Sequence, residues 1–296
     1  MITGASGFVG QNLSKYLKQN KHIVQSLSLR NEHWENQLNP KADAIIHLAG
    51  KAHDTSNISA EDEYFKINRD LTINLYQLFL NSEIKDFFYF SSVKAVADTV
   101  EGVLEETVEG KPFTTYGKSK LEAEQYLLSQ TLPQGKRIFI IRPCMIHGPG
   151  NKGNLNLLYK VVQKGLPWPL AAFRNHRSFL SINNLSFLVD AMLSKTDLTS
   201  GVYNFADDES LSTNELVILI SRTLGRSPKL LPIPTSLVKG LVKVGDFLPL
   251  PLNSERLKKL TESYVVSNDK IKRSLGINKL PVSAKEGLLH TIKSFI

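Results

Sequence analysis

The segment Thr3-Gly4-Ala5-Ser6-Gly7-Phe8-Val9-Gly10 contains three glycines, each three residues after the last. In a strand–turn–helix unit the first glycine permits the tight turn, the second lets the backbone approach a pyrophosphate, and the third lets the helix pack on the strand. The N–H groups at the start of the helix then point at the phosphates. The segment therefore predicts a dinucleotide site formed by Gly4, Ser6, Gly7, Phe8, Val9 and Gly10.

Short apolar runs alternate with helical patterns in the first half of the chain. The runs AIIHLA (44–49), FFYFSS (87–92) and RIFIIRP (137–143) are typical of buried parallel strands. Helical patterns occupy residues 11–19, 66–81 and 116–130. This alternation predicts an α/β fold with a doubly wound parallel sheet. Only Met1 and Ile2 precede the glycine segment, so we expect a short first strand or a trimmed start.

The composition is that of an ordinary globular protein. Of 296 residues, 42% are hydrophobic and 22% charged, and the single cysteine, Cys144, cannot form an internal disulfide, which favours a reducing, cytoplasmic setting. We expect no transmembrane segment and no signal peptide, because no apolar run is long enough and no cationic region precedes one. The net charge of +8 suits a phosphate-bearing small molecule or a solvated basic surface, and no basic arm points to nucleic acid.

The sequence changes character after Gly148. We expect residues 1–148 to form the dinucleotide-binding domain, completed by parts of 179–206 and 262–270, and residues 149–296 to form mainly a smaller, discontinuous substrate-binding domain. A strand is predicted at 201–206 and a helix at 213–224, which Ser212 and Glu215 begin with a capping box. The Pro- and Leu-rich stretch 230–253 predicts a buried or cleft-facing amphipathic helix, with a helix on a membrane surface as the alternative.

The second strand, read at 22–31, bears on the cofactor. NAD-binding units usually carry Asp or Glu at the end of this strand to bind the ribose 2′-hydroxyl. Here the strand end holds Ser28 and Arg30 and no carboxylate. A hydroxyl and a guanidinium suit a 2′-phosphate, so NADP(H) is favoured and NAD(H) stays possible.

Tyr116 and Lys120 are four residues apart in a predicted helix and therefore share one face. A cation beside the phenol would lower the pKa of Tyr116 from about 10, so that it could exchange a proton with a hydroxyl or a ketone. Ser91 and Ser92 end the preceding strand, where a hydroxyl could polarise the same oxygen. The Tyr-x-x-x-Lys spacing often arises by chance, but its combination with the serines and the glycine segment favours catalysis.

These motifs resemble those of the extended short-chain dehydrogenase/reductases that act on nucleotide-sugars. The matching segments run from TGASGFVG through DAIIHLAG, FFYFSSVK, YGKSK, IRPCMIHGPG and NHRSF to SNDKIKRSLGI. The resemblance implies a Rossmann domain with a small C-terminal substrate domain and a homodimer. It implies a catalytic trio of Ser92, Tyr116 and Lys120, and cofactor contacts from Leu48, Ala49, Gly50, Asn68, Ser91 and Pro143. It further implies that Asn154, Arg177 and Arg256 bind a UDP-sugar, although Arg256 could also be a solvated charge.

Two departures from the family pattern narrow the reaction. Val93 and Lys94 stand where the dehydratases of the family have Asp-Glu, so dehydration is not expected. The sequence is most similar to the branch of bacterial polysaccharide synthesis that holds UDP-sugar 4-epimerases and 4-keto reductases. The end of the second strand favours NADPH-dependent reduction of a UDP-4-keto-6-deoxy-N-acetylhexosamine. The alternatives are an NAD-dependent UDP-hexose 4-epimerase and a non-catalytic NADP-binding sensor.

Other reactive side chains do not suggest a site. His47 and His53 have no cysteine or carboxylate cluster beside them, so no metal site is expected. Cys144 follows Pro143 at a strand end and is interpreted as a packed thiol rather than a nucleophile.

Overall fold

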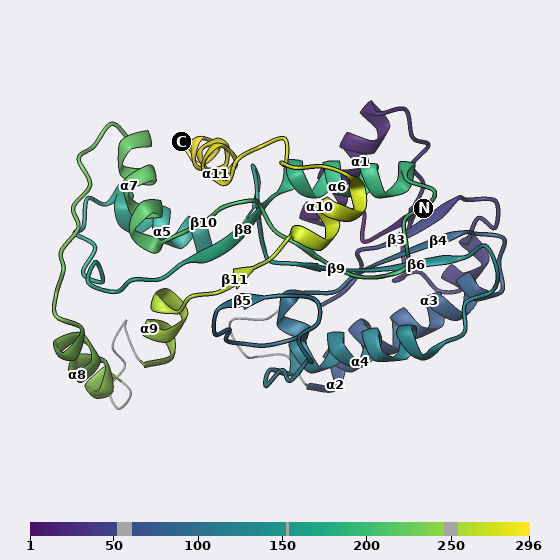
Figure 1. Cartoon of the computed structure of the whole chain (residues 1–296), viewed down its shortest axis with the longest axis horizontal. Coiled ribbons are helices and arrows are strands. Elements are labelled where there is room, and N and C mark those ends of the chain that lie inside the picture. The colour runs from purple at the N-terminus through teal and green to yellow at the C-terminus, as the bar shows by residue number, and fades with distance from the viewer. Residues whose placement is uncertain (52–60, 152–153, 246–253) are drawn as a thin grey trace.

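The main sheet of the protein is formed by six parallel strands. The structure is a computed structural model that describes residues 1–51, 61–151, 154–245 and 254–296. The strand order is β2-β1-β3-β4-β6-β9 (Figure 1), with β1 at Ile2–Thr3, β2 at Ser26–Leu27, β3 at Ala44–His47, β4 at Asp86–Phe90, β6 at Arg137–Pro143 and β9 at Gly201–Phe205. Since β2 and β3 flank β1 on opposite sides, the winding reverses beside β1. This arrangement confirms the predicted doubly wound parallel sheet.

The observed strands end earlier than the predicted runs. A strand is present in each of the runs 44–49, 87–92 and 201–206, but the last one or two residues of each run belong to the loop at the carboxyl edge of the sheet. The first strand is short, as expected. The second strand is much shorter than the run 22–31, because only Ser26 and Leu27 pair with β1. The residues that follow each strand therefore lie in loops at the carboxyl edge, where ligands of such sheets bind.

Helices cover both faces of the sheet (Figure 1). On one face, α1 (Phe8–Gln19) packs against α6 (Ile182–Ser194). On the other, α3 (Leu71–Leu80) packs against α4 (Thr115–Ser129). The predicted helix 66–81 is divided, because its first turn is a π-helix, η2 (Lys66–Asp70), which follows α2 (Glu61–Phe65).

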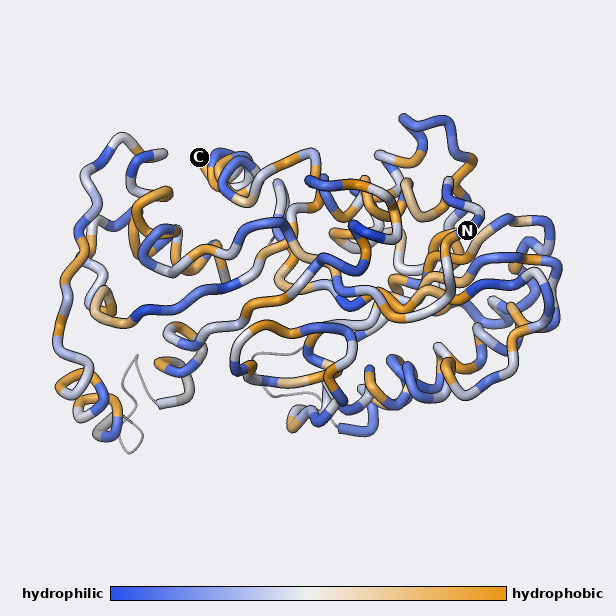
Figure 2. The backbone as a smooth tube through the Cα atoms, viewed as in Figure 1, coloured by the Kyte–Doolittle hydropathy of each residue, from blue (hydrophilic) through white to orange (hydrophobic). Residues whose placement is uncertain are grey.

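The central strand β4 is apolar at every position after Asp86, and its place in the sheet explains why. Phe88 and Phe90 join the core beneath α1 and α6, whereas Phe87 and Tyr89 join the core beneath α3 and α4. All four side chains are buried. A parallel sheet covered on both faces needs apolar side chains on both. Figure 2 shows hydrophobic segments gathered along the strands.

The second half of the chain forms smaller layers and also returns to the main sheet. It supplies helix α6, which packs beside α1, and strand β9, which pairs with β6 in the main sheet. A three-stranded sheet joins β10 (Ser210–Leu211), β8 (Arg177–Ser181) and β7 (Met145–His147), and β5 (Val103–Leu104) pairs with β11 (Val265–Val266). The remaining helices are η1 (Trp34–Gln37), η3 (Val93–Ala95), α5 (Asn154–Gln163), α7 (Thr213–Thr223), α8 (Thr235–Gly245), α9 (Ser254–Thr261), α10 (Asp269–Leu275) and α11 (Ala284–Lys293).

Two local predictions for this half can be compared with the structure. The capping box of α7 is present, because Ser212 and the Glu215 side chain each bond the other's backbone N–H. The Pro- and Leu-rich stretch contains the amphipathic helix α8, which buries Val238 and Val242 but leaves Leu237 and Leu241 60% and 67% exposed. The stretch from 246 to 253 lies outside the described residues. Among the described helices, none combines the length and apolarity needed to cross a membrane.

Two helical glycines predict opposite effects of the same substitution. A Cβ at Gly10 would overlap the Gly4 carbonyl oxygen and lie 2.6 Å from Ala5 Cα, so Gly10→Ala should lower the free energy of unfolding by about 1–3 kcal/mol. A Cβ at Gly240 in α8 would meet nothing within 4 Å, so Gly240→Ala should raise it by up to about 1 kcal/mol. Urea denaturation measures both, and a Gly10→Ala protein as stable as the parent would contradict the close approach of α1 to the glycine turn.

Candidate active site

Two loops meet at the carboxyl edge where the winding of the sheet reverses. Gly4 follows β1 with a φ of +67°, in the left-handed region that glycine tolerates best. A Cβ there would lie 2.7 Å from the backbone nitrogen of Ala49, which belongs to the loop after β3. Ligands of doubly wound sheets bind in this crevice. The fold therefore places the glycine segment and the loop Leu48–Gly50 side by side at the expected cofactor site.

The N-terminus of α1 fits the diphosphate of a dinucleotide. Its N-cap, Gly7, offers no side chain to the first N–H groups of the helix. A Cβ at Gly7 would meet only the Gly4 carbonyl oxygen, at 3.4 Å, whereas one at Gly10 would clash. The turn is thus tight against the protein at Gly4 and Gly10 and open at Gly7, where Ser6 is also exposed. Unpaired N–H groups at an exposed helix N-terminus favour an anion.

The end of β2 lies beside this turn. Leu27 is in register with Thr3, so Ser28 follows β2 at the level at which Gly4 follows β1. Ser28 and Arg30 are both exposed, and Arg30 forms no ion pair with any carboxylate that the structure describes. The two side chains therefore lie where the sequence analysis placed the ribose discriminator.

A chain of buried hydrogen bonds runs beneath the site. The Thr72 hydroxyl donates to the Asn68 carbonyl (2.8 Å), so His47 Nε2 must donate to Thr72 Oγ1 (2.9 Å). His47 Nδ1 then accepts from Thr3 Oγ1 (2.7 Å), whose oxygen accepts the Ala49 N–H (3.1 Å). This bonding requires neutral His47. Burial and, to a smaller extent, the charge of Lys120 together lower the pKa of His47 to about 3.

His47 is therefore a structural residue. In the described part of the chain, no group of three His, Cys, Asp or Glu side chains could hold a metal ion, and His53 lies outside the described residues.

Asn68 joins the loop after β3 to helix α4, which bears the candidate residues Tyr116 and Lys120. Its Oδ1 accepts the Lys51 N–H (2.8 Å), and its Nδ2 donates to the Lys51 carbonyl and to Ser119 Oγ, each at 3.1 Å. The π-helix η2 turns this fully buried side chain inward. Since a Cβ at Gly50 would lie 3.0 Å from Asn68 Oδ1 and 3.2 Å from Lys120 Nζ, the loop after β3 passes directly over both residues.

Ser92 and Tyr116 are brought together by two helix N-termini. Ser92 caps η3 and accepts the Lys94 N–H at 3.2 Å. Tyr116 lies in the first turn of α4, where Thr114 is the N-cap. The Tyr116 and Ser92 side chains are hydrogen-bonded. Folding therefore brings together two hydroxyl groups that are 24 positions apart in the sequence.

Lys120 lies one helical turn after Tyr116 and is buried, with 5% of its surface exposed. Its ammonium donates to the Phe90 carbonyl (2.9 Å) and lies 4.9 Å from the centre of the Tyr89 ring. Burial lowers the pKa of Lys120 to about 8, and the Glu124 carboxylate opposes this effect.

The sequence analysis expected a lowered pKa for Tyr116, and this expectation is wrong for the protein without ligands. Burial raises the pKa of Tyr116, and the hydrogen bond with Ser92 opposes this. Lys120 is not among the groups that shift it, because the ammonium turns to the Phe90 carbonyl. The ring of Tyr64 also packs edge-on against that of Tyr116, with centroids 6.4 Å apart. Helical spacing alone did not decide where the lysine points.

The two remaining cofactor candidates lie on adjacent strands. Ser91 follows β4 and is buried, and its hydroxyl has no hydrogen-bond partner among the described residues. Pro143 ends β6 in register with Phe205 and is buried. Both lie at the carboxyl edge of the parallel sheet, the edge at which the glycine turn follows β1.

The residues expected to bind substrate are only partly described. Arg177 begins β8, is half-buried, and pairs through its backbone with Tyr264. The Tyr264 hydroxyl donates to the carbonyls of Val93 (3.0 Å) and Ala97 (2.7 Å), which connects Arg177 to the segment after Ser92. Burial lowers the pKa of Arg177, and the charge of Glu262 opposes this.

Asn154 begins α5 and Arg256 lies in α9, but their side chains lie outside the described residues.

Sequence reasoning missed three features of the site. Tyr64 packs on Tyr116, and Lys51 forms an ion pair with Glu63 (2.7 Å) beside it. Glu124 lies buried behind Lys120. Only Glu124 had a local signal, because it follows Lys120 by four residues and therefore shares its helix face.

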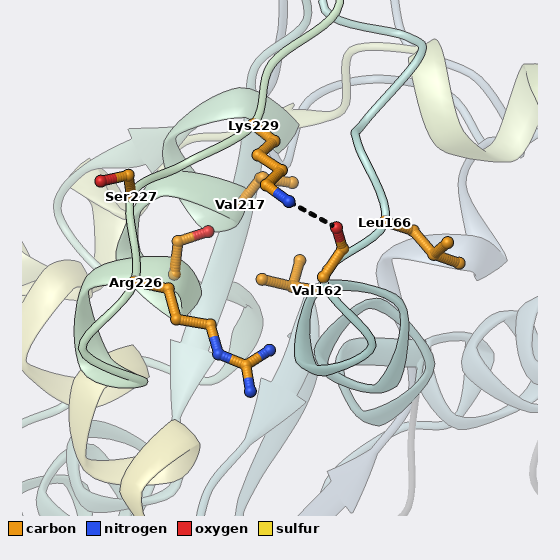
Figure 3. A pocket seen from close by; sticks show the side chains of 8 residues that line it. Val162, Leu166, Val217, Arg226, Ser227 and Lys229 are labelled. Carbon is orange, nitrogen blue, oxygen red and sulfur yellow. Dashed lines mark hydrogen bonds between the residues drawn. The ribbon is translucent and has the colours of Figure 1, made fainter.

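A hollow of about 410 Å³ lies elsewhere, between the end of α5 and the segment after α7. Figure 3 shows Lys229 reaching across it. Lys229 Nζ donates to the Gly165 carbonyl (3.3 Å) and Arg226 Nη1 donates to the Gln163 carbonyl (2.5 Å). These cations stabilise the carbonyl groups at the C-terminal end of α5. We therefore interpret the charged side chains around the hollow as structural.

Comparisons with known proteins agree with this geometry. The model of the "NAD dependent epimerase/dehydratase family" matches residues 1–206. The UDP-glucose 4-epimerase of Vibrio cholerae is 30% identical over 327 residues, which covers 100% of this chain and 95% of that protein. The N-acetyl-alpha-D-glucosaminyl-diphospho-ditrans,octacis-undecaprenol 4-epimerase of Escherichia coli O157:H7 is 27% identical over 292 residues, which covers 92% and 84%. The solved structure "MoeE5 in complex with UDP-glucose and NAD" shares the fold, with a TM-score of 0.76, 19% identity, and coverage of 99% and 97%.

The neutral state of His47 predicts an acid-sensitive stability. Its pKa is about 3 in the folded protein and about 6.5 in the unfolded chain, so the unfolded chain binds more protons between these values. Stability from this residue is complete above pH 6.5 and falls as the pH drops, by about 2 kcal/mol between pH 7 and pH 5. We expect His47→Gln to lose about that much less between the two pH values in urea denaturation. His290→Gln, at an exposed position, should behave as the parent protein, and equal acid sensitivity of all three would refute the assignment.

Proposed function

The chain belongs to the NAD dependent epimerase/dehydratase family, and on this premise we propose that it is a UDP-sugar 4-epimerase. The observation that carries the proposal is the hydrogen-bonded pair Ser92 and Tyr116, with buried Lys120 one turn behind it at the cofactor edge of the sheet. Both relatives compared above are 4-epimerases. For this reason we prefer epimerisation to the reduction that the sequence favoured.

The chemistry divides between the cofactor and the side chains. A nicotinamide dinucleotide, when bound, accepts a hydride from the sugar and returns it. Tyr116 must first release its own proton to solvent; as a phenolate it then takes the proton from the 4-hydroxyl oxygen and gives it back to the same atom. Ser92 hydrogen-bonds that oxygen and keeps it beside the phenol. Lys120 supplies a positive charge one helical turn behind the pair, and its ammonium would favour the phenolate on turning from the Phe90 carbonyl toward Tyr116.

The substrate contacts follow from charge. Arg177 would bind the diphosphate, because its guanidinium can bond two oxygens at once. Asn154 and Arg256 are proposed to contact the nucleotide from α5 and α9. The cofactor would contact Gly4 to Gly10, Leu48 to Gly50, Asn68, Ser91 and Pro143, and we propose that residues 149–296 supply most of the substrate-binding domain.

A second candidate is an NADPH-dependent reductase of a UDP-4-keto sugar. It is favoured by one observation, the exposed hydroxyl and guanidinium of Ser28 and Arg30 at the end of β2. A reductase consumes reduced cofactor in step with product, whereas an epimerase shows no net consumption. In either case we propose a cytoplasmic homodimer that acts in polysaccharide synthesis.

Tyr116→Phe tests the proton-transfer role. We expect turnover of the UDP-sugar to fall by about 10²- to 10⁴-fold, because the phenylalanine cannot exchange a proton. Dinucleotide affinity, measured by the quenching of protein fluorescence, should change little. Tyr126→Phe is the matched control on the same helix, since the Tyr126 hydroxyl accepts a hydrogen bond from Gln77 Nε2 (2.6 Å) on α3. A Tyr116→Phe enzyme with full activity would remove the phenol from the mechanism.

Arg30→Ala tests the cofactor. If Arg30 binds a 2′-phosphate, its loss should weaken NADP(H) binding about tenfold or more and leave NAD(H) binding unchanged. Calorimetric titration with both dinucleotides measures this, with Arg273→Ala as an exposed arginine control on α10. Tight NAD(H) binding that is indifferent to Arg30, together with interconversion of UDP-glucose and its 4-epimer without net cofactor consumption, supports the epimerase. Stoichiometric NADPH oxidation would establish the reductase in its place.

A further inference from the structure

Helix α8 has an apolar side that the fold leaves uncovered. Figure 1 shows this helix at one end of the molecule and well away from the main sheet. Val238 and Val242 join a core that also holds Leu257 of α9, so one stripe of α8 is fixed against the protein. Beside this stripe Leu237 and Leu241 are exposed. Single exposed leucines are common, but these two are one helical turn apart and form a continuous apolar edge.

Lysines lie on the other side of the valine stripe. Because successive residues of a helix are rotated by about 100°, Lys239 and Lys243 lie across the valines from the leucines. Together with Lys258 of α9 they line a hollow of about 290 Å³ between the two helices, and no carboxylate lines it. Lys258 pairs with Glu262 (3.3 Å), whereas Lys239 and Lys243 pair with no carboxylate of the described residues. Two ammonium groups of the hollow therefore lack a counter-charge there.

The outward side of α8, between the leucines and the lysines, carries small residues. Ser236 is exposed, and a Cβ at Gly240 would meet nothing within 4 Å. No bulky side chain of these two residues keeps a flat surface from lying along the helix. Lysine side chains are long enough to reach phosphate groups while leucines enter an apolar layer. The arrangement is typical of a helix that lies in the plane of a bilayer surface.

An anionic bilayer suits this surface better than a second copy of the chain does. A symmetric contact between two copies would bring the same lysines toward one another, and like charges repel. A bilayer of anionic lipid offers phosphates to the ammonium groups and acyl chains to the leucines. The formal net charge of +8 attracts the whole chain to such a bilayer.

We propose that α8 and Lys258 dock the protein on the surface of an anionic lipid bilayer, without crossing it. Leu237 and Leu241 enter the headgroup layer, and the three lysines face lipid phosphates. The proposal does not rest on the proposed function, because neither a sugar nor a dinucleotide takes part in the contact.

Sedimentation of the full chain with lipid vesicles tests the role of the lysines. We expect about tenfold or tighter binding to vesicles of phosphatidylglycerol and phosphatidylcholine than to phosphatidylcholine alone, and weaker binding as the salt concentration rises. Lys239→Gln with Lys243→Gln should weaken binding to the anionic vesicles about tenfold or more. Lys15→Gln with Lys18→Gln is the matched control, because it removes two exposed lysines from α1 and gives the same net charge. This control should bind nearly as the parent protein does.

The leucines are tested by two further sets of variants. Leu237→Ser with Leu241→Ser should weaken binding to the anionic vesicles about tenfold or more, with an unchanged circular dichroism spectrum because both positions are exposed. In Leu241→Trp, fluorescence should move to shorter wavelengths when the anionic vesicles are added. Ile23→Trp is the control, at a position that is 91% exposed and outside α8, and its fluorescence should not move.

Three results would overturn the docking proposal. The first is equal binding to both kinds of vesicle, or binding to neither. The second is binding that both double variants of α8 leave unchanged. The third is self-association in analytical ultracentrifugation that Leu237→Ser with Leu241→Ser abolishes, which would assign the surface to a second copy of the chain. A parent protein that docks as expected but turns over no UDP-sugar would support the docking proposal and contradict the proposed function.

Discussion

The close approach of two loops at the carboxyl edge of the sheet is the constraint on which the site depends. The backbone after β1 and the backbone after β3 lie so near each other at Gly4 and Ala49 that no side chain fits between them. The same crowding recurs at Gly10, where α1 lies against the turn. Because these contacts hold the helix N-terminus beside the loop over Asn68 and Lys120, the proposed phosphate-binding groups and the proposed catalytic groups face one crevice.

Beneath that crevice, buried polar side chains are joined by hydrogen bonds, with the Ser91 hydroxyl as an exception among the described residues. His47 links the end of β1 to α3, and Asn68 links η2 to α4. Lys120 is held by a carbonyl, with the Glu124–Arg142 pair behind it. A buried polar group without a partner costs several kcal/mol in an apolar environment, so this network also fixes the geometry of the residues above it.

Two opposing effects of the protein set the pKa of Tyr116. Burial favours the protonated phenol, and Ser92 only partly opposes this. Catalysis in such a site depends on groups brought together by folding, not on one reactive side chain.

The local pattern of residues was enough to identify the parallel strands, the helices between them, the glycine turn and the capping box of α7, because each depends on residues near one another in the chain. It also identified Ser92, Tyr116 and Lys120 as candidates. It failed for the direction of the Lys120 ammonium and for the Glu124–Arg142 and His47–Thr72 contacts. Those depend on which strand or helix packs opposite each side chain and on how deeply each is buried, and only the folded chain brings residues so far apart in sequence into contact and removes them from water.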